Sequence, residues 1–522
     1  MSVQTNTLSA DEDYGYASNY NGIRTCNLLI DKIDEFEKVE PALRKKYSAE
    51  ARVMRAWLYM NLTLYFGDVP LVATAVNDYP GGLARTPSKE VREWILKELD
   101  EAFTILPEKN DKGAFNKAMT YAIKARAAYY FGNYDLAEKA ARYVIDNGGY
   151  QLYSVSELSD SMKKDAEFFK KLVDFNSMGV DEQAFVQGIF NYQNIWNVDN
   201  NSETIIAKEY TATEEHGDFN RVTSFLTPNL VAKQAWATIV PIQDLVDAYW
   251  TVDGKNKPTL PSVETRITNF KSLSDKIKTL RKGPDGLEST TNDNLTFSQA
   301  VNTIVNSIAS EPYMSQYKNR DSRLYASIIF PFSAINKYVA GEYQEYQADI
   351  VNYGRSGFAF RKMSGADDAV SVWGDDYFMS GADFPVIRLA EMLLIFAESH
   401  TQKTGYDASV TTELNKLRTR CGMPAVPAGM GKAQAIDFIR SERRIELAGE
   451  GLRFYDIRLY EDSQRNGGFT GTEAASTVMK GQTYDVIGNL SALKTWENRL
   501  MYMPLPVTSM DKNTALIQNK GY

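Results

Sequence analysis

Hydrophobic positions in the first 150 residues recur every three or four residues, the spacing of one face of a helix. Ser48 can cap such a helix, and Gly67 can end it. The apolar stripe between them consists of Ala51, Met54, Leu58, Leu62 and Tyr65. We expect this stripe to lie in the core of the protein.

Small residues dominate the next predicted helix, which begins at Asn116. Its stripe consists of Ala118, Ala122, Ala125 and Tyr129. Gly132 and Asn133 then turn the chain into a partner helix, whose apolar positions are Ala137, Ala140 and Val144. The segment YYFGNYDLAEKAARYVID resembles half of a tetratricopeptide repeat. Because a single pair of this kind does not bury its own apolar face, we expect such pairs to stack into a curved scaffold.

The middle of the chain loses this regularity and becomes rich in Asn, Asp, Ser, Gly and aromatic residues. Residues 264–282 and 298–309 still show helical spacing, and residues 351–362 indicate a turn and a short strand. Helical patterns return from residue 384 to residue 460. Loops held by a rigid scaffold often carry function, so the irregular part is the predicted binding region.

The segment ERRIELAGEGLRFYDIRLY, residues 442–460, is unusually rich in charge. Glu442, Arg443, Glu446 and Glu450 recur at helical spacing, which allows acids and arginines to pair along one face. Gly451 is expected to break the helix. Arg453, Asp456 and Arg458 follow among the aromatic residues. This pattern favours a partly buried structural ion network over an active site.

Composition excludes several classes of function. The chain has 522 residues, of which 43% are hydrophobic and 24% charged, and a formal net charge of −9. Without a basic patch, nucleic acid is not an expected partner. Cys26 and Cys421 are the only cysteines, and both fit small buried hydrophobes better than a disulfide. No stretch of eighteen apolar residues occurs.

Motifs for catalysis, cofactors and metals are missing from the sequence. The two histidines, His216 and His400, form no zinc-binding pattern and make a histidine-based triad improbable. The GRSG segment at Gly354 is one residue short of a nucleophile elbow, and GMG at Gly429 lacks a dinucleotide-binding context. We therefore predict no catalytic residue, no cofactor and no metal ligand. Two opposed carboxylates would suffice for glycoside hydrolysis, so a hydrolase stays open as a less favoured alternative.

Aromatic residues supply the positive argument for binding. The chain has 31 tyrosines, and sugars bind well to an aromatic ring flanked by amide, carboxylate or arginine side chains. The predicted ligand-binding residues are Asn77, Asp78, Tyr79, Tyr192, Trp196, Tyr353, Arg355, Trp373 and Tyr377. The alternative for each aromatic residue is that it anchors its loop to the core.

Motifs along the whole chain resemble those of the SusD/RagB family. They include RAWLYMNLTLYFGDVPLV at residues 55–72, NSETIIAKEY at 201–210, KNRDSRLYASII at 318–329, FPVIRLAEMLLIFAES at 384–399, the charged segment at 442–460 and the final QNKGY. The resemblance implies a mostly α fold: a tetratricopeptide-like helix-pair scaffold with a loop-rich part and a few short strands. We expect residues 1–150 to form the N-terminal scaffold, 151–383 a loop-rich ligand-binding region, and 384–522 a C-terminal helical part that completes the same globular unit.

The resemblance also implies a function. Proteins similar to SusD capture oligosaccharides at the cell surface and act as the lid of a TonB-dependent, SusC-like outer-membrane transporter, without breaking a bond. RagB-like relatives suggest oligopeptide capture as the alternative, which would gain support if the loop aromatics proved to be buried. Members of the family carry an N-terminal lipid anchor on the extracellular face of the outer membrane. We expect this sequence to begin just past the lipidated cysteine and to be soluble in that form.

Overall fold

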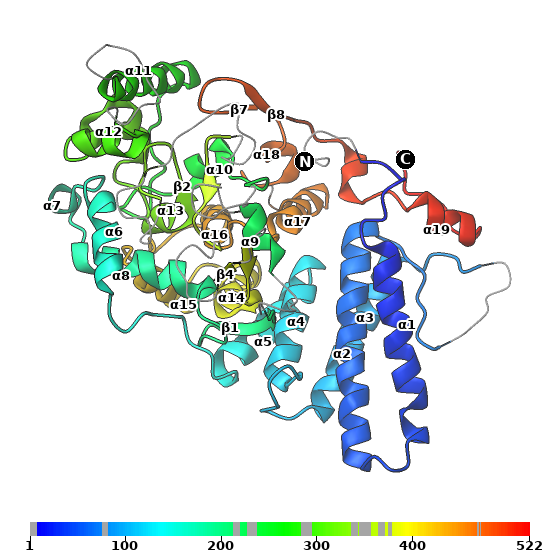
Figure 1. The fold of residues 1–522 in the computed structure, drawn as a ribbon. Coiled ribbons are helices and arrows are strands. Elements are labelled where there is room, and N and C mark those ends of the chain that lie inside the picture. Colours follow the sequence, from blue (N-terminus) through cyan, green and yellow to red (C-terminus); the bar gives the residue numbers. More distant parts are fainter. Residues whose placement is uncertain are drawn as a thin grey trace.

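The computed structural model describes residues 8–75, 82–211, 220–226, 237–282, 295–335, 356–363 and 378–466, residues 471–522, the strand at 371–373, and the single residues 343 and 469. Helices dominate these regions, and 3₁₀ helices are labelled η (Figure 1). The main hydrophobic core runs through the described chain, from Leu8 near its start to Leu516 near its end, and two small clusters lie apart from it.

Five long helices form the N-terminal scaffold (Figure 1). They are α1 (Tyr16–Lys32), α2 (Pro41–Phe66), α3 (Ser88–Ile105), α4 (Lys117–Tyr130) and α5 (Tyr134–Asn147), with η1 (Ile33–Glu35) after α1. The predicted pair α4–α5 is confirmed, because Asn116 caps α4 through Met119 N, Asn133 caps α5 through Leu136 N, and both small-residue stripes are buried.

Helix α2 differs from the prediction in its start and in its buried face. It begins at Pro41, whose fixed φ suits the first turn, and not at Ser48. Met54, predicted to lie in the core, is 42% exposed, whereas Val53 and Ala56 are fully buried. The reason is that α2 packs against α1 and α3 on two sides, so its buried face is wider than one stripe and is rotated from the predicted one.

The middle of the chain contains more helix than the sequence pattern predicted. Its helices are α6 (Asp160–Lys170), α7 (Phe175–Met178), α8 (Glu182–Gln193), η2 (Asn194–Trp196), α9 (Arg221–Leu226), α10 (Gln243–Ala248), α11 (Val263–Arg281), α12 (Phe297–Ile304), η3 (Ile308–Ser310), η4 (Pro312–Tyr317) and α13 (Ser322–Ser327). The predicted helix at 264–282 is confirmed as α11. The helix predicted at 298–309 is split, since α12 ends at Ile304 and a 3₁₀ turn follows.

Strands are short and pair two by two in antiparallel fashion. The pairs are β1 (Thr204–Lys208) with β6 (Phe384–Arg388), β2 (Ile328–Ile329) with β3 (Ala359–Phe360), β4 (Ser371–Trp373) with β5 (Phe378–Ser380), and β7 (Gly481–Tyr484) with β8 (Leu490–Lys494). In the first pair Thr204 lies opposite Arg388, which brings the middle of the chain to the start of the C-terminal helices. The predicted strand within 351–362 is confirmed as β3.

The C-terminal part packs back onto the scaffold. Its helices are α14 (Leu389–Lys403), α15 (Ala408–Arg420), α16 (Lys432–Glu446), α17 (Arg453–Arg465), α18 (Ala475–Val478), η6 (Asn498–Met501) and α19 (Val507–Lys512). Helix α14 lies against α4 and α5. The start of the described chain lies against its C-terminal part, because Val507 N donates to Ala10 O at 2.9 Å.

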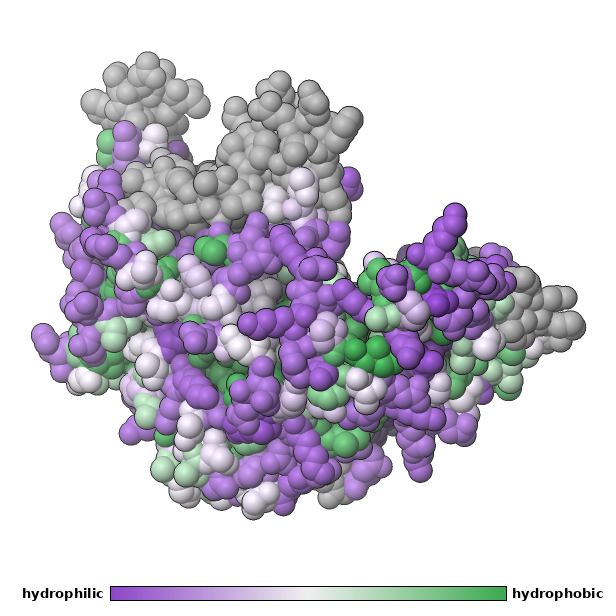
Figure 2. Space-filling model, turned by 90° about the horizontal axis from the view of Figure 1, so that it is seen from below, coloured by the Kyte–Doolittle hydropathy of each residue, from purple (hydrophilic) through white to green (hydrophobic). Residues whose placement is uncertain are grey.

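One face of the molecule is predominantly polar. On the face seen from below, hydrophilic side chains cover most of the area and hydrophobic ones form small separate patches (Figure 2). None of the helices in the described part of the chain is both long enough and apolar enough to span a membrane.

Candidate functional site

The charged segment at residues 442–460 lies at the centre of a buried ion network. Five cations and five carboxylates form one connected cluster in which every side chain is at most 5% exposed. The cations are Arg323, Lys362, Arg388, Arg418 and Arg420, and the carboxylates are Glu203, Asp321, Glu442, Glu446 and Glu450. The cluster is electrically neutral and closed to solvent, so the predicted structural role is confirmed.

The partners of the glutamates differ from the predicted ones. The three glutamates of α16 and the turn after it were expected to pair along their own helix, but they pair with cations from other elements. Glu446 accepts from Arg388 at 2.8 Å, from Arg323 at 3.1 Å and from Arg420. Arg443 instead donates to Asp456 of α17 at 2.9 Å. The network therefore joins β6, α13, α15 and α16.

The network keeps its carboxylates ionised despite burial. Burial alone would raise the pKa of Glu442, but the guanidinium groups of Arg323 and Arg418 lower that pKa to about 2. The same balance lowers the pKa of Glu450, where burial is opposed by Arg388 and Lys362. These carboxylates are saturated with internal partners and are not available to a substrate.

Tyr192 and Trp196 belong to this interior and not to a binding surface. Tyr192 is fully buried and donates its hydroxyl to Glu446 O at 2.6 Å. Trp196 is 4% exposed, and Lys362 Nζ lies 4.1 Å from the centre of its ring. The prediction that these two side chains contact a ligand is corrected, because cation–π contacts with the network hold both rings in the core.

The other predicted binding residues are not placed by the structure. Asn77, Asp78, Tyr79, Tyr353, Arg355 and Tyr377 lie outside the described residues. The backbone of Trp373 is in strand β4, paired with Phe378. Contacts of these residues with a ligand stay predictions.

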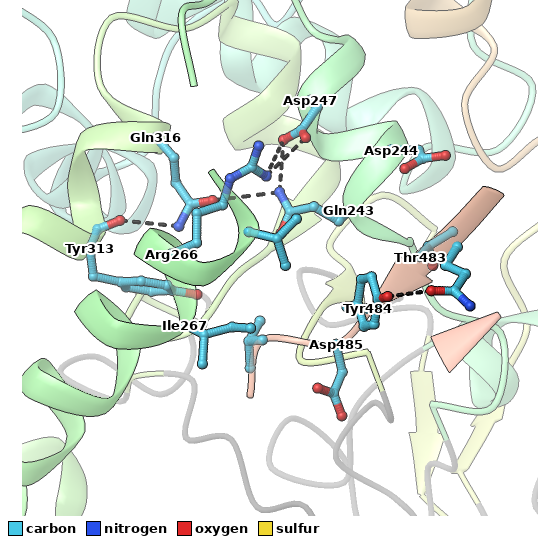
Figure 3. A pocket seen from close by; sticks show the side chains of 13 residues that line it. Gln243, Asp244, Asp247, Arg266, Ile267, Tyr313, Gln316, Thr483, Tyr484 and Asp485 are labelled. Carbon is cyan, nitrogen blue, oxygen red and sulfur yellow. Dashed lines mark hydrogen bonds and ion pairs between the residues drawn. The ribbon is translucent and has the colours of Figure 1, made fainter. Parts of the chain in front are cut away.

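A polar pocket opens to solvent between α10, α11, η4 and the hairpin β7–β8 (Figure 3). Its volume is about 90 Å³. It is lined by Gln243, Asp244, Asp247, Val263, Arg266, Ile267, Tyr313, Gln316, Gln482, Thr483, Tyr484, Asp485 and Val486. Carboxylate, amide, guanidinium and phenol groups thus converge on one small cavity, which we call the polar pocket.

The base of the polar pocket is a fixed hydrogen-bond network. Arg266 Nη1 donates to Asp247 at 2.9 and 3.1 Å, and Gln243 Nε2 donates to the same carboxylate at 2.7 Å (Figure 3). Gln243 also lies 3.5 Å from the amide oxygen of Gln316. Tyr313 is buried below this network. These hydrogen bonds fix the orientation of the side chains, so the donors and acceptors that remain free at the cavity are also fixed in orientation.

The rim of the polar pocket is the hairpin, and its turn is fixed by Asp485. The Asp485 carboxylate accepts from Ile487 N at 3.0 Å and from Asn489 N at 2.8 Å. Gly488 adopts φ +93° at the tip, and a Cβ there would lie 2.7 Å from the side chain of Ile267, so glycine lets the turn rest on α11. Tyr484 is half-buried and donates its hydroxyl to Gln482 (Figure 3).

Sequence reasoning missed the polar pocket. Its residues come from four separate segments of the chain, and α10 is too short to give a periodic signal. The one local signal was the turn-forming sequence YDVIGN at 484–489, which indicates a hairpin bearing a tyrosine.

The remaining residues considered for catalysis or metal binding are the histidines, cysteines and acidic side chains of the described regions. These regions contain no group of three histidine, cysteine or acidic side chains that could hold a metal ion. His400 is held by Glu138 at 2.8 Å and by Asp407 at 3.0 Å, while His216 lies outside those regions. Cys26 and Cys421 are free and buried, as predicted, and burial raises the pKa of the Cys421 thiol to about 11.

Comparison with known proteins identifies relatives of the whole chain. A sequence model described as the SusD family matches residues 202–522, and one described as starch-binding associating with outer membrane matches residues 3–129. SusD-like protein P2 of Formosa agariphila is 22% identical over 544 residues, which cover 99% of this chain and 83% of that protein.

Solved structures share the fold. A SusD-like protein from Bacteroides fragilis has a TM-score of 0.71 at 21% identity and covers 100% of this chain and 89% of its own. A SusD-like carbohydrate binding protein from the same species has a TM-score of 0.66 at 18% identity and covers 99% of this chain and 88% of its own. The predicted mostly α fold is confirmed.

Proposed function

The chain belongs to the SusD family, and from this premise we propose that it is a non-catalytic glycan-binding protein of the cell surface. It captures oligosaccharides and delivers them, as a lid, to a TonB-dependent, SusC-like transporter of the outer membrane. The observation that carries the proposal is the polar pocket, which presents the chemistry of a sugar site in a chain of this family.

The lining of the polar pocket suits a sugar in three respects. Gln482 at the rim and Gln243 at the base offer amide donors and acceptors to hydroxyl groups. Tyr484 offers a partly exposed ring to the C–H face of a sugar. The cavity of about 90 Å³ is open and takes only part of one sugar unit, so the ligand extends beyond it.

The role at the membrane is inferred from the relatives. The family model that matches residues 3–129 describes starch binding in association with the outer membrane. A solved relative is described as carbohydrate binding. A lid needs a rigid body and a separate recognition face, and the helical scaffold with a hairpin-rimmed pocket fits that division.

One observation favours a second candidate, the capture of oligopeptides. Tyr192 and Trp196 are buried, which removes two aromatic rings from the surface on which a glycan would stack. Peptide capture depends less on aromatic platforms, and hydrogen-bonding groups such as those of the polar pocket also serve a peptide backbone.

Binding of the purified chain to a glycan array, with an oligopeptide library alongside, separates the two candidates. We expect glycan hits whose binding is weakened about tenfold or more by Tyr484→Ala or Trp373→Ala, in line with the value of an aromatic contact. Binding of peptides alone would support the second candidate. Release of shortened sugars would contradict the non-catalytic role, and no binding of either class would contradict capture by the chain alone.

A further inference from the structure

A second cavity adjoins the polar pocket and shares one residue, Asp244, with it. Its volume is about 210 Å³, and we call it the basic cavity. It is lined by Ile242, Asp244, Leu245, Arg443, Arg444, Leu447, Ala448, Gly449, Gly451, Arg453, Asp456, Ile457, Val478, Met479 and Lys494. Asp244 pairs with Lys494 of strand β8, so this ion pair marks the boundary between the two cavities.

Positive charge exceeds negative charge around the basic cavity. Its lining holds four cations, from Arg443, Arg444, Arg453 and Lys494, and two carboxylates, from Asp244 and Asp456. Glu473, just outside the lining, pairs with Arg453 and lies 3.6 Å from Arg444. Glu391, also outside the lining, lies 3.8 Å from Arg443 and pairs with Arg126. With Glu473, Glu391 and Arg126 counted, five cations face four carboxylates, which leaves an excess of one positive charge.

Helix α17 points its N-terminus at the same cavity. The helix has 13 residues; Arg453, Asp456 and Ile457 near its start line the cavity, as does Gly451 just before it. No side chain caps its first turn, so the N–H groups there have no side-chain acceptor. The partial positive charge of a helix N-terminus adds to that of the four cations and favours an anion.

Two arginines of the lining retain unused donors. Arg443 is 1% exposed; it donates from Nε to Asp456 and from Nη2 to Tyr130, each at 2.9 Å, but its Nη1 has no partner in the described structure. Arg453 donates from Nη2 to Glu473, and its Nη1 likewise has no partner there. A buried guanidinium nitrogen without an acceptor is costly. An anionic ligand in the cavity would supply an acceptor to Arg453, whereas the enclosed Arg443 contributes positive charge to the lining.

We propose that the chain binds an acidic oligosaccharide across both cavities, with part of one sugar unit in the polar pocket and the carboxylate or sulfate group of a neighbouring unit in the basic cavity. This rests on the proposed function and names its substrate class. Lys494 and Arg453 are the contacts for the anionic group, because their side chains are 10% and 32% exposed, whereas Arg443 is enclosed. Asp244, shared by both cavities, accepts hydrogen bonds from the hydroxyl groups between the two units.

The test uses matched pairs of glycans with the same sugar backbone, in which one member carries the anionic group and the other does not. Oligogalacturonides are compared with their methyl esters, and sulfated galactan oligomers with their desulfated forms, by titration calorimetry with the full chain. We expect the charged member of at least one pair to bind about tenfold more tightly, the value of one charge-assisted hydrogen bond, and the difference to shrink as salt rises. The two pairs distinguish a carboxylate from a sulfate.

Variants assign the preference to the basic cavity. Lys494→Gln and Arg453→Gln should each remove most of the preference for charge, and Lys494→Arg should retain it. Lys480→Gln removes a charge from an exposed position next to the same hairpin and should leave the preference for charged glycans unchanged. Equal binding of charged and neutral members, or a preference untouched by Lys494→Gln and Arg453→Gln in folded protein, would overturn the proposal. Binding of neutral glycans alone would overturn the substrate class and leave the proposed function standing, and binding of no glycan would overturn both.

Discussion

Replacement of Glu446 by glutamine should be the most damaging isosteric change in the ion network. The Glu446 carboxylate is buried and accepts hydrogen bonds from Arg388, Arg323 and Arg420. Glu446→Gln keeps the shape but leaves five cations facing four carboxylates in the interior. The new amide group also turns a donor toward guanidinium groups that need acceptors.

The expected loss follows from the burial of this cluster. Removing one partner of a buried ion pair costs about 3 to 5 kcal/mol, because the opposite charge is left uncompensated. Whole domains are stable by roughly 5 to 15 kcal/mol, so the variant should approach the limit of folding. The ratio of unfolded to folded protein should rise by about two to four orders of magnitude.

Equilibrium unfolding in urea at pH 7, followed by circular dichroism, measures this loss. The matched control is Glu101→Gln, because Glu101 is 44% exposed and its pair with Arg52 at 3.0 Å lies on the surface. The control should lose less than about 1 kcal/mol. The double variant Glu446→Gln, Arg420→Met restores neutrality and should recover part of the stability. A loss of less than about 1 kcal/mol for Glu446→Gln, or no recovery in the double variant, would refute the argument from buried charge.

Two further changes test other parts of the structure. Burial opposes protonation of His400, but Glu138 and Asp407 raise its pKa above the ordinary 6.5, so its stabilising contribution is complete below pH 6.5 and is lost as the pH rises through the raised pKa. The melting temperature of the wild type relative to His400→Gln should therefore fall as the pH rises above about 6.5, and parallel pH profiles would contradict this role. Gly422→Ala should destabilise by more than about 3 kcal/mol, since φ is +61° and a Cβ would lie 2.1 Å from the neighbouring backbone. Gly132→Ala, at φ +73° with open space around it, should cost only about 1 to 2 kcal/mol in the same urea titration, and equal losses would contradict the steric argument.

Local patterns in the sequence predicted helices that pack against their neighbours in the sequence. Helices α4 and α5 follow from their caps and small-residue stripes, since each contacts the other directly. The buried face of α2 was predicted only in part: Ala51 and Leu62 are buried but Met54 is exposed, because the face depends on neighbours on two sides. The role of the charged segment was predicted correctly, but its partners, such as Arg323 and Arg388, come from distant parts of the chain and could not be named.

For the candidate site, the sequence predicted the type of binding residue, an aromatic ring with polar neighbours, but not the location of the pocket. Tyr192 lies in an Asn-rich aromatic segment that looks like a surface loop, yet a lysine 170 positions away holds it in the core. The polar pocket brings α10, α11 and the hairpin at 481–494 together, and nothing in these segments indicates that they meet. Tertiary packing determines both the burial of Tyr192 and the assembly of the polar pocket.

Titration of the purified chain with the best glycan from the array tests the central claim most directly, when wild type is compared with Tyr484→Ala and with the control Tyr47→Ala. Tyr47 is an exposed tyrosine of α2, outside the polar pocket. We expect glycan binding to weaken about tenfold or more in Tyr484→Ala and to be unchanged in Tyr47→Ala, with both proteins folded. Undiminished binding in Tyr484→Ala would contradict capture at this pocket.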